Sequence, residues 1–318
     1  MPDASDARKV VTVPDERWEG LWPDGQAPLD VVLWPVEGDL PDGLDDRAPS
    51  LVVLPYLDSS RAIPRLASIE GLEVVQTLTA GYDNVLAHLP DGVTLCNAAG
   101  VHDASTAELA VGLAIAALRG IGDFARAQVR GEWLSGYRPA LADRRVLVIG
   151  TGSVGSAVVD RFAPFEVHLT RVASRARDDD RGHVHGVDEL PALLPDHDVV
   201  VLVVPLNDST RGLVDGAFLA AMPDGALLVN VARGGVVDTD ALVAEVSTGR
   251  IAAALDVTDP EPLPADHPLW RLPGVLISPH VGGDTAAFPP RARKLLRAQL
   301  ERWAAGEPLA NVVGGPPR

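Results

Sequence analysis

Short runs of apolar, mostly β-branched residues recur along this chain and alternate with longer stretches of helical character. They fall into two sets, at residues 10–13, 31–34, 51–54, 73–77 and 93–95, and then at 146–149, 167–173, 199–204, 226–231, 251–256 and 275–278. Strands that are apolar on consecutive residues are covered by helices on both faces, as in parallel sheets. The sequence therefore predicts two parallel-sheet α/β units.

Length and composition limit the function classes. A chain of 318 residues is long for one core and suits two domains. The net charge of −17, with no block of Lys or Arg, disfavours a nucleic-acid partner. There is no apolar stretch of about eighteen residues and no basic start followed by an apolar run, so we expect a soluble, cytoplasmic protein without a membrane segment. Cys96 is the single cysteine, which excludes an internal disulfide and a thiolate metal cluster.

Two helical segments frame the second set of strands. Residues 103–120 are apolar almost all round and rich in small residues, so they predict a long helix buried between the domains, which would serve as a hinge. The last periodic segment runs from Arg291 to Ala305 and ends at Gly306, with Pro308 just beyond. We expect it to pack back onto the first domain.

A glycine-rich loop opens the second set. Residues 144–155 read RRVLVIGTGSVG, a strand that runs into Gly150, Gly152 and Gly155 and then into a helical stretch. In this context the glycines permit a tight turn, close approach of a pyrophosphate and close packing of helix on strand. The motif alone is weak, but its flanking strand and helix favour dinucleotide binding, with Ser153 and Val154 at the start of the helix.

The end of the next strand favours NADP over NAD. An NAD site places Asp or Glu here to bind the ribose 2′-hydroxyl, whereas this strand ends at Ala173 and continues with Ser174, Arg175 and Arg177. A small residue leaves room for a 2′-phosphate, and the hydroxyl and guanidinium groups can bind it. The alternative is an ordinary basic surface loop that binds no phosphate. In that case the aspartates at 178–180 would reduce its positive electrostatic potential.

Three reactive side chains follow successive strands of the second set. Arg233 is a planar cation that can bind a carboxylate with two hydrogen bonds and polarise a neighbouring carbonyl. His280 is suited to proton exchange, and Glu261 could orient it and favour its protonated form. Ligands of doubly wound sheets bind at the carboxyl ends of strands, so together these groups predict hydride-transfer chemistry on a 2-oxo acid.

From about residue 50 to its end, the chain resembles the D-isomer-specific 2-hydroxyacid dehydrogenase family. The motifs that carry the resemblance are TAGYDNV (79–85), NAAGVHDASTAELA (97–110), VVPLNDSTRGLVD (203–215) and AGEPLANVV (305–313), together with the three strand ends above. The resemblance implies a Rossmann cofactor domain, residues 101–284, inserted in a flavodoxin-like substrate domain, residues 1–100 plus 285–318. Both would be doubly wound α/β domains, and the protein would be a homodimer formed through the cofactor domains.

The resemblance also implies residue roles. The backbone amides of Ala80 and Gly81 would receive the substrate carboxylate, and Arg233 would bind substrate. His280 would exchange the proton, supported by Glu261. Cofactor contacts would come from Thr106, Val204, Pro205, Thr210 and Val231, and Asp256 would hold the carboxamide end.

Some segments depart from the family pattern, and a few other residues indicate no functional role. PYLDSS (55–60) replaces the usual loop, and Pro289 and Pro290 fall where a helix normally begins, so we expect that helix to start late. His183 and His185 form an HxH pair with no carboxylate or third ligand at a helpful spacing, so no metal site is expected. Trp133 and Trp303 are interpreted as packing residues.

The sequence thus predicts an NADP-dependent reductase of a small 2-oxo acid such as glyoxylate or hydroxypyruvate, with NAD as the less favoured cofactor. Formate or phosphite oxidation on the same scaffold is weaker, because formate dehydrogenases of the family lack the partner that Glu261 supplies. A nucleotide-sensing, corepressor-like binding protein of the same fold stays open as the alternative from another class.

Overall fold

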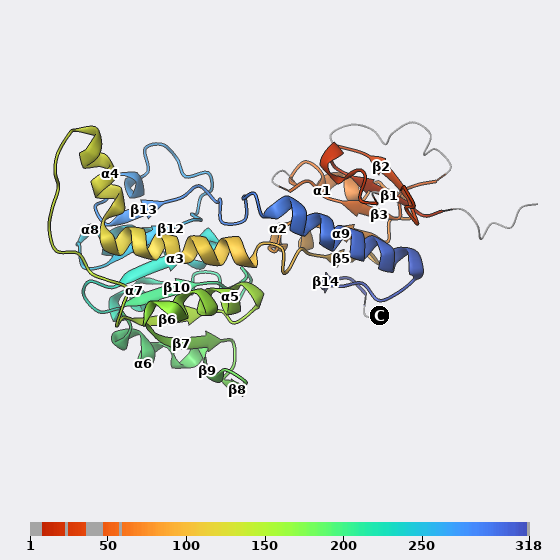
Figure 1. Ribbon diagram of the computed structural model, residues 1–318. Helices are drawn as coiled ribbons and strands as arrows, with labels where there is room; N and C mark the ends of the chain where they lie inside the picture. Colours follow the sequence, from red (N-terminus) through yellow and green to blue (C-terminus); the bar gives the residue numbers. More distant parts are fainter. Residues whose placement is uncertain (1–7, 23–24, 36–46, 57–58, 317–318) are drawn as a thin grey trace, which may run out of the picture. The chain divides into compact units, whose positions relative to one another are not determined.

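The computed structural model describes residues 8–22, 25–35, 47–56 and 59–316. It divides into two compact units, residues 1–102 with 286–318 and residues 103–285. Each unit holds its own sheet, with helices on both faces (Figure 1). The fold class is therefore α/β with two domains, as the sequence predicts. The segment PYLDSS lies partly outside the described residues.

The first unit contains a six-stranded sheet of order β14-β5-β4-β3-β1-β2. All neighbours pair in parallel except β14, which is antiparallel to β5. The first five strands have the order 2-1-3-4-5 of flavodoxin-like sheets. The strands are β1 (Val10–Val13), β2 (Asp30–Leu33), β3 (Leu51–Val53), β4 (Val74–Gln76), β5 (Thr94–Cys96) and β14 (Val312–Gly314), and the helices are η1 (Glu16–Trp18), α1 (Ile63–Leu66), α2 (Asp83–Leu86) and α9 (Phe288–Ala305).

Helix α9 closes the first unit and corrects one expectation. It begins at Phe288, so Pro289 and Pro290 do not delay it. Both prolines occupy the first turn, where the backbone N–H groups have no partner within the helix and their loss costs little. Buried Phe288, Leu296 and Trp303 place one face of α9 in a core shared with β1, β3 and β4. The expected packing of this helix onto the first unit is confirmed.

The second unit contains an eight-stranded sheet of order β13-β12-β11-β10-β6-β7-β9-β8. From β9 to β13 its strands are parallel and follow the order 3-2-1-4-5-6 of a Rossmann sheet, extended by β13. The strands are β6 (Arg145–Ile149), β7 (His168–Ala173), β8 (Arg177–Asp179), β9 (Gly182–Gly186), β10 (Val199–Leu202), β11 (Leu227–Asn230), β12 (Ala252–Leu255) and β13 (Val275–Ile277).

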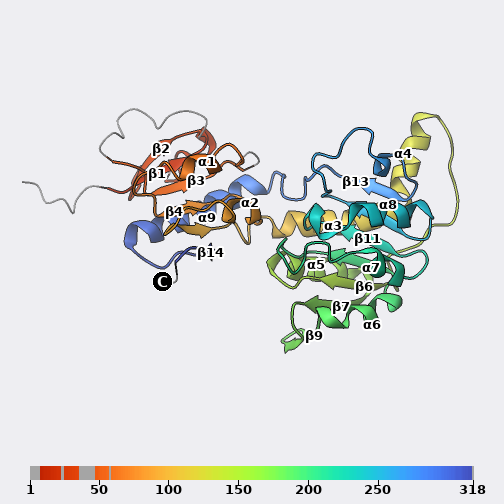
Figure 2. The same ribbon diagram turned by 180° about the vertical axis from the view of Figure 1, so that it is seen from behind.

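The helices of the second unit cover both faces of this sheet, as Figure 2 also shows. They are α3 (Asp103–Arg119), α4 (Ile121–Val129), α5 (Ser153–Phe162), α6 (Leu190–Leu193), α7 (Gly216–Ala221) and α8 (Thr239–Ser247), with the short turns η2 (Ala163–Phe165), η3 (Val187–Glu189), η4 (Leu194–Asp196), η5 (Gly234–Val236) and η6 (Pro268–Trp270).

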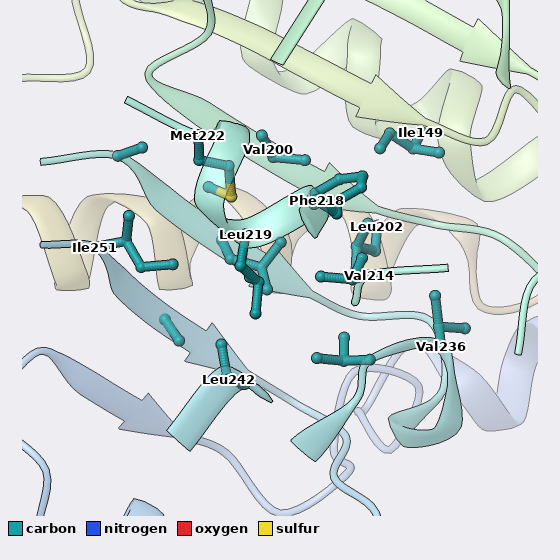
Figure 3. Close-up of a cluster of buried hydrophobic side chains, with 14 of the residues drawn as sticks. Ile149, Val200, Leu202, Val214, Phe218, Leu219, Met222, Val236, Leu242 and Ile251 are labelled. Atoms are coloured by element: carbon teal, nitrogen blue, oxygen red, sulfur yellow. The ribbon is translucent and has the colours of Figure 1, made fainter. Parts of the chain in front are cut away.

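Burial on both faces explains the continuous apolar runs of the sequence. In β10, Val199 and Val201 face the core under α3 and α5, whereas Val200 and Leu202 face the core under α6, α7 and α8. Figure 3 shows this second core, in which Phe218, Leu219 and Met222 lie against the sheet. Successive side chains of a strand point to opposite faces, so a strand covered on both sides has few polar positions.

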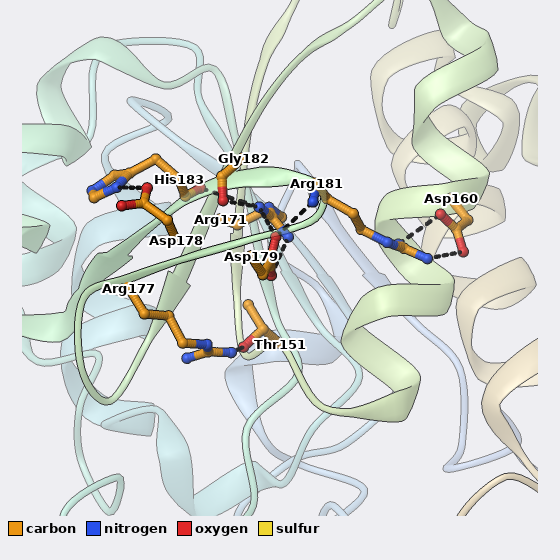
Figure 4. Close-up of polar contacts among 9 residues, drawn as sticks. All are labelled: Thr151, Asp160, Arg171, Arg177, Asp178, Asp179, Arg181, Gly182 and His183. Atoms are coloured by element: carbon orange, nitrogen blue, oxygen red, sulfur yellow. Dashed lines mark hydrogen bonds and ion pairs between the residues drawn. The ribbon is translucent and has the colours of Figure 1, made fainter.

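Three short or polar strands were not predicted from the sequence. They are the polar hairpin β8–β9 and the C-terminal strand β14. The guanidinium of Arg171, only 8% exposed, donates to Asp179 and to the carbonyls of Gly182 and His183 (Figure 4). The hairpin is therefore held by a partly buried charge-assisted network in place of an apolar face.

The tryptophans differ from each other. Trp303 is 4% exposed, as expected of a packing residue, but Trp133 is 97% exposed, so the interpretation of Trp133 as a packing residue within this chain is wrong.

No single described helix is long and apolar enough to cross a membrane. Helices α3 and α4 pass that test of length and composition only as a pair bent by 65°.

The buried His197 should make stability depend on pH. Its Nδ1 lies 2.7 Å from the carbonyl of Leu193 and its Nε2 lies 2.8 Å from the hydroxyl of Thr170. A carbonyl only accepts, so Nδ1 carries the proton and Nε2 accepts from Thr170 in a neutral ring. Desolvation by burial lowers the pKa of His197 below its ordinary value of 6.5.

His197 should therefore add stability that is fully present above pH 6.5 and is lost as the pH falls through its lowered folded-state pKa. Below pH 6.5 the unfolded chain binds this proton before the folded chain does. Urea unfolding from about pH 7.5 to about pH 5 should show the free energy of unfolding falling more steeply for the natural chain than for His197→Gln. Equal slopes would remove His197 as the cause.

Candidate active site

In the glycine-rich loop between β6 and α5, neighbouring backbone atoms leave no room for a side chain at two of the three glycines. A Cβ on Gly155 would lie 2.0 Å from the carbonyl oxygen of Gly150, and a Cβ on Gly150, whose φ is +113°, would lie 2.3 Å from that of Val203. Gly152, by contrast, has no atom within 4 Å of a Cβ position and caps α5 without a side-chain hydrogen bond. The first turn of α5 therefore presents its N–H groups to open space, which fits a pyrophosphate.

A cavity of about 290 Å³ adjoins this loop. Thr151 and Gly155 line it from the loop, and Arg171 and Asp179 line it from β7 and β8. Arg177 reaches across and donates from Nη2 to the Thr151 hydroxyl at 2.7 Å (Figure 4). Strand β7 ends at Ala173, and the Ser174 and Arg175 that follow are exposed. The structure thus brings Arg177 to the glycine loop, beside the strand end that lacks an acid.

Two of the aspartates that could weaken this positive charge are engaged elsewhere. Asp179 is paired with Arg171, whose hydrogen bond is the largest cause of the lowered pKa of that carboxyl. Asp178 lies 2.9 Å from His183 on the other side of β8 (Figure 4). Strand geometry therefore sends Arg177 and Asp178 to opposite faces.

The remaining expected cofactor residues lie around the same edge of the sheet. Val204 is close to Gly150, and the Thr210 hydroxyl donates to the carbonyl of Pro205 at 2.6 Å, which closes the loop after β10. Val231 is buried directly after β11. Thr106, on the first turn of α3, lies 3.5 Å from a Cβ position on Gly282. Their contacts with a cofactor stay a prediction.

Arg233 is positioned by a buried amide and by a close approach of two loops. Asn230, 1% exposed, donates to the carbonyl of Arg233 and accepts from the N–H of Ala232. A Cβ on Gly234 would lie 1.9 Å from the carbonyl oxygen of Thr258. Only glycine lets the loop after β11 pack this closely on the loop after β12, which brings Arg233 near Glu261.

His280 and Glu261 form a direct pair through Nδ1 of the ring and Oε1 of the carboxylate. Partial burial by itself raises the pKa of Glu261. The hydrogen bond and charge of His280, the N–H of Thr258 and the charge of Arg233 outweigh that effect and lower the pKa below its ordinary value. Glu261 is therefore ionised near neutral pH, and it accepts from an Nδ1–H, which leaves Nε2 as the other reactive nitrogen.

Asp256 organises the backbone that carries His280, a role the sequence analysis missed. It is 4% exposed and accepts hydrogen bonds from Ser278 at 2.6 Å, from the N–H of Val281 at 3.0 Å and from that of Gly282 at 2.9 Å. His280 itself has φ +53°, a left-handed conformation that is uncommon for a residue with a Cβ. Asp256 supports this conformation, and its remaining acceptor capacity is what the expected carboxamide contact would use.

Ala80 and Gly81 lie in the first unit. Their carbonyl oxygens accept from Asn97 at 2.7 Å and from Thr79 at 2.6 Å. Among the described residues, neither backbone N–H donates to another backbone or side-chain group. Their contact with a substrate carboxylate stays a prediction.

Comparison with known proteins identifies the family. More than half of the chain, residues 111–282, matches the model of the D-isomer specific 2-hydroxyacid dehydrogenase NAD binding domain. The chain belongs to the D-isomer-specific 2-hydroxyacid dehydrogenase family. It is therefore an NAD(P)-dependent oxidoreductase of that family, and the second unit is its Rossmann domain.

Relatives of the dehydrogenase span several named activities. Glyoxylate reductase from Thermofilum pendens is 32% identical over 249 residues, which cover 74% of this chain and 73% of that protein. D-3-phosphoglycerate dehydrogenase from Methanocaldococcus jannaschii is 34% identical over 256 residues, but the chain spans only 48% of its length. A family member from Xanthobacter autotrophicus Py2, solved with NADPH and MES, is 30% identical with a TM-score of 0.79, and the match covers 97% of this chain and 98% of that one.

A carboxylate lies beside the HxH pair of the dehydrogenase, His183 and His185, contrary to the expectation from the sequence. Glu189, four residues after His185, places Oε2 2.7 Å from Nδ1 of that ring, so the expectation that no carboxylate stands at a helpful spacing is wrong. The spacing was missed because the sequence shows no helix there, whereas the chain turns through η3 directly after β9.

Proposed function

We propose that the dehydrogenase reduces a small 2-oxo acid, such as glyoxylate or hydroxypyruvate, with NADPH, and catalyses the reverse oxidation of the D-2-hydroxy acid. The observation that carries this proposal is the His280–Glu261 pair beside Arg233, held at the ends of neighbouring parallel strands. A proton donor, its partner and a carboxylate-binding cation are the groups that this reaction needs.

Each residue has a distinct part in the proposed reaction. Arg233 binds the substrate carboxylate through its guanidinium and polarises the neighbouring carbonyl. Protonated His280 donates a proton from Nε2 to the oxygen that becomes the hydroxyl, and it removes that proton in the reverse direction. Glu261 holds the ring through Nδ1 and stabilises its charged form. The nicotinamide, when bound, supplies or accepts the hydride.

The proposed cofactor site extends from the glycine loop to the end of β7. Gly150, Gly152, Ser153, Val154 and Gly155 would surround the pyrophosphate, and Ser174, Arg175 and Arg177 would bind the 2′-phosphate. The Arg177–Thr151 contact and the engagement of Asp178 and Asp179 with other partners support a preference for NADP over NAD. The NADPH in the Xanthobacter autotrophicus structure agrees with this choice.

In this proposal the first unit is the substrate domain and the second unit is the cofactor domain. The amides of Ala80 and Gly81 would receive the substrate carboxylate. A cytoplasmic location belongs to the same proposal, and recovery of the protein outside the cytoplasmic fraction would contradict it.

The direct test follows the oxidation of NADPH and NADH by the purified enzyme with a panel of 2-oxo acids. Turnover with NADPH on glyoxylate, hydroxypyruvate or a simple relative is the expected result. Turnover with NADH alone would keep the reaction and reject the 2′-phosphate site. If tight cofactor binding occurs without any turnover, the corepressor-like alternative replaces the proposal, and activity on formate or phosphite would replace the substrate class.

We also propose that the enzyme is a homodimer formed through the second unit. The surface there exposes large apolar side chains on α4 and on the extended segment after it, including Val129 at 88%, Trp133 at 97% and Tyr137 at 94%. Figure 1 shows this yellow-green segment leaving α4 and running back towards β6. A cluster of exposed aromatic residues on one element marks a protein interface, and a second copy is the occupant the family implies.

A charge in this cluster should separate the subunits. Trp133→Glu places a carboxylate in the interface, where it would be desolvated without a partner. Sedimentation velocity should show a dimer for the natural chain and a monomer for the variant, whereas Phe165→Glu, at a side chain of η2 that is 38% exposed and lies outside this segment, should stay dimeric. A monomeric natural chain would overturn the assignment.

A further inference from the structure

A cluster of imidazole and carboxylate groups lies on the β8–β9 hairpin. His183 and His185 are two residues apart on β9 and so share one face of the strand. Asp178 stands directly opposite His183 on the antiparallel partner β8, and Glu189 ends the η3 turn that follows β9. Three of these side chains, those of His183, His185 and Glu189, bring their metal-binding atoms together, and none of them belongs to the proposed reaction site.

The spacing within this hairpin cluster suits one ion. The ligand atoms of His183, His185 and Glu189 all lie within 4.8 Å of one another. The two imidazole rings stand at 87° with centroids 4.5 Å apart, so they meet edge to face and are not stacked. Ligands around a tetrahedral zinc ion are roughly 3.3 Å apart, given metal–ligand distances of about 2.0–2.1 Å. Small side-chain rotations would bring these atoms to that spacing.

The backbone beneath the cluster is fixed by contacts outside it. Arg171 binds the carbonyls of Gly182 and His183 and the carboxylate of Asp179, which sets the start of β9 (Figure 4). The N–H of Gly186 donates to Glu189 at 2.7 Å, which turns that carboxylate back towards β9. A preorganised scaffold reduces the conformational entropy that a ligand must overcome.

We propose that His183, His185 and Glu189 bind a divalent transition-metal ion of the zinc class, with water completing its coordination. Two imidazoles favour Zn²⁺, Co²⁺ or Ni²⁺ over Mg²⁺ and Ca²⁺, which prefer all-oxygen sites. The ion would replace the proton now shared in the pair His185–Glu189. It would cross-link β9 and η3 and so stabilise the hairpin that carries Arg177.

Zinc binding should be measured on the full-length protein after removal of any affinity tag and dialysis against a chelator. Titration with ZnCl₂ in a calorimeter should show about one equivalent bound with micromolar or tighter affinity, and MgCl₂ should give no heat. His183→Ala and His185→Ala should each weaken binding roughly tenfold or more, and the double variant should abolish it. His168→Ala, at an exposed histidine on β7, is the matched control and should bind as the natural chain does.

A second readout uses Co²⁺, whose visible absorption reports on its ligands. The natural chain and His168→Ala should give the spectrum of a site with nitrogen ligands, and the double variant should give that of hydrated Co²⁺. Equal zinc affinity in the double variant, or binding at millimolar concentration only, would overturn the site. Both measurements are made without cofactor or substrate, so their failure leaves the proposed dehydrogenase reaction untouched.

Discussion

Replacing His280 by alanine should lower kcat for the preferred 2-oxo acid by roughly 10²-fold or more, the scale of a lost acid-base group. The Kd of NADPH should change little, because the ring contacts Glu261 and lies apart from the glycine loop in sequence and in its contacts. Stopped-flow reduction and fluorescence titration of NADPH measure the two quantities separately. An unchanged kcat would remove His280 from its role.

A second variant is needed because the backbone conformation at His280 is unfavourable for alanine. Its φ of +53° is strained for alanine, whereas asparagine adopts this region more readily. His280→Asn should therefore keep the melting temperature of the natural enzyme and still lose the rate. His168→Ala, which changes an exposed ring on β7, should retain full kcat.

Glu261 can be separated from His280 by the same assays. Glu261→Gln keeps a hydrogen-bonding group but removes the charge that stabilises the protonated ring. We expect a smaller loss of kcat than for His280→Asn and an effect on the pH profile. The carboxyl of Glu261 has a lowered pKa, so its own protonation should limit the natural enzyme only below the ordinary glutamate value of 4.5.

Much of this architecture follows from the sequence because burial on both faces removes polar residues from the central strands. Val199–Leu202 and Leu227–Asn230 are examples in which both faces contact a core. The same rule fails for Arg177–Asp179 and Gly182–Gly186, since buried Arg171 holds them by charge-assisted hydrogen bonds across the sheet. A pattern of hydrophobicity cannot reveal a strand that is stabilised in this way.

The site was predictable to the level of the groups that follow each strand. Arg233, Glu261 and His280 stand where the strand ends place them, because parallel strands align their carboxyl ends at one edge. Their supports were not predictable, since the contacts of Asp256 with Ser278 and Gly282 and the approach of Gly234 to Thr258 depend on how neighbouring loops pack. Such contacts join residues more than twenty positions apart and leave no local signal.

Introducing an acid at the end of β7 should reverse the cofactor preference. In Ala173→Asp, the new carboxylate would repel a 2′-phosphate and could bind the ribose hydroxyls of NAD. Arg177→Ala should remove a charge-assisted contact of about 1.5–3 kcal/mol, or roughly 10- to 10²-fold in the affinity for NADPH. Together the two changes should lower the ratio of kcat/KM for NADPH to that for NADH by at least about 10²-fold.

The structure explains why Arg177 should carry this effect and the nearby acids should not. Its guanidinium already lies on the glycine loop at Thr151, whereas Asp179 forms its ion pair with Arg171 and Asp178 faces His183. Arg145→Ala removes an arginine that pairs with Asp196 and should leave the ratio unchanged. If Ala173→Asp and Arg177→Ala leave the ratio of kcat/KM for NADPH to that for NADH as it is in the natural enzyme, the residues at the end of β7 do not determine the choice between the two cofactors. The 2′-phosphate would then have to be bound by another part of the second unit.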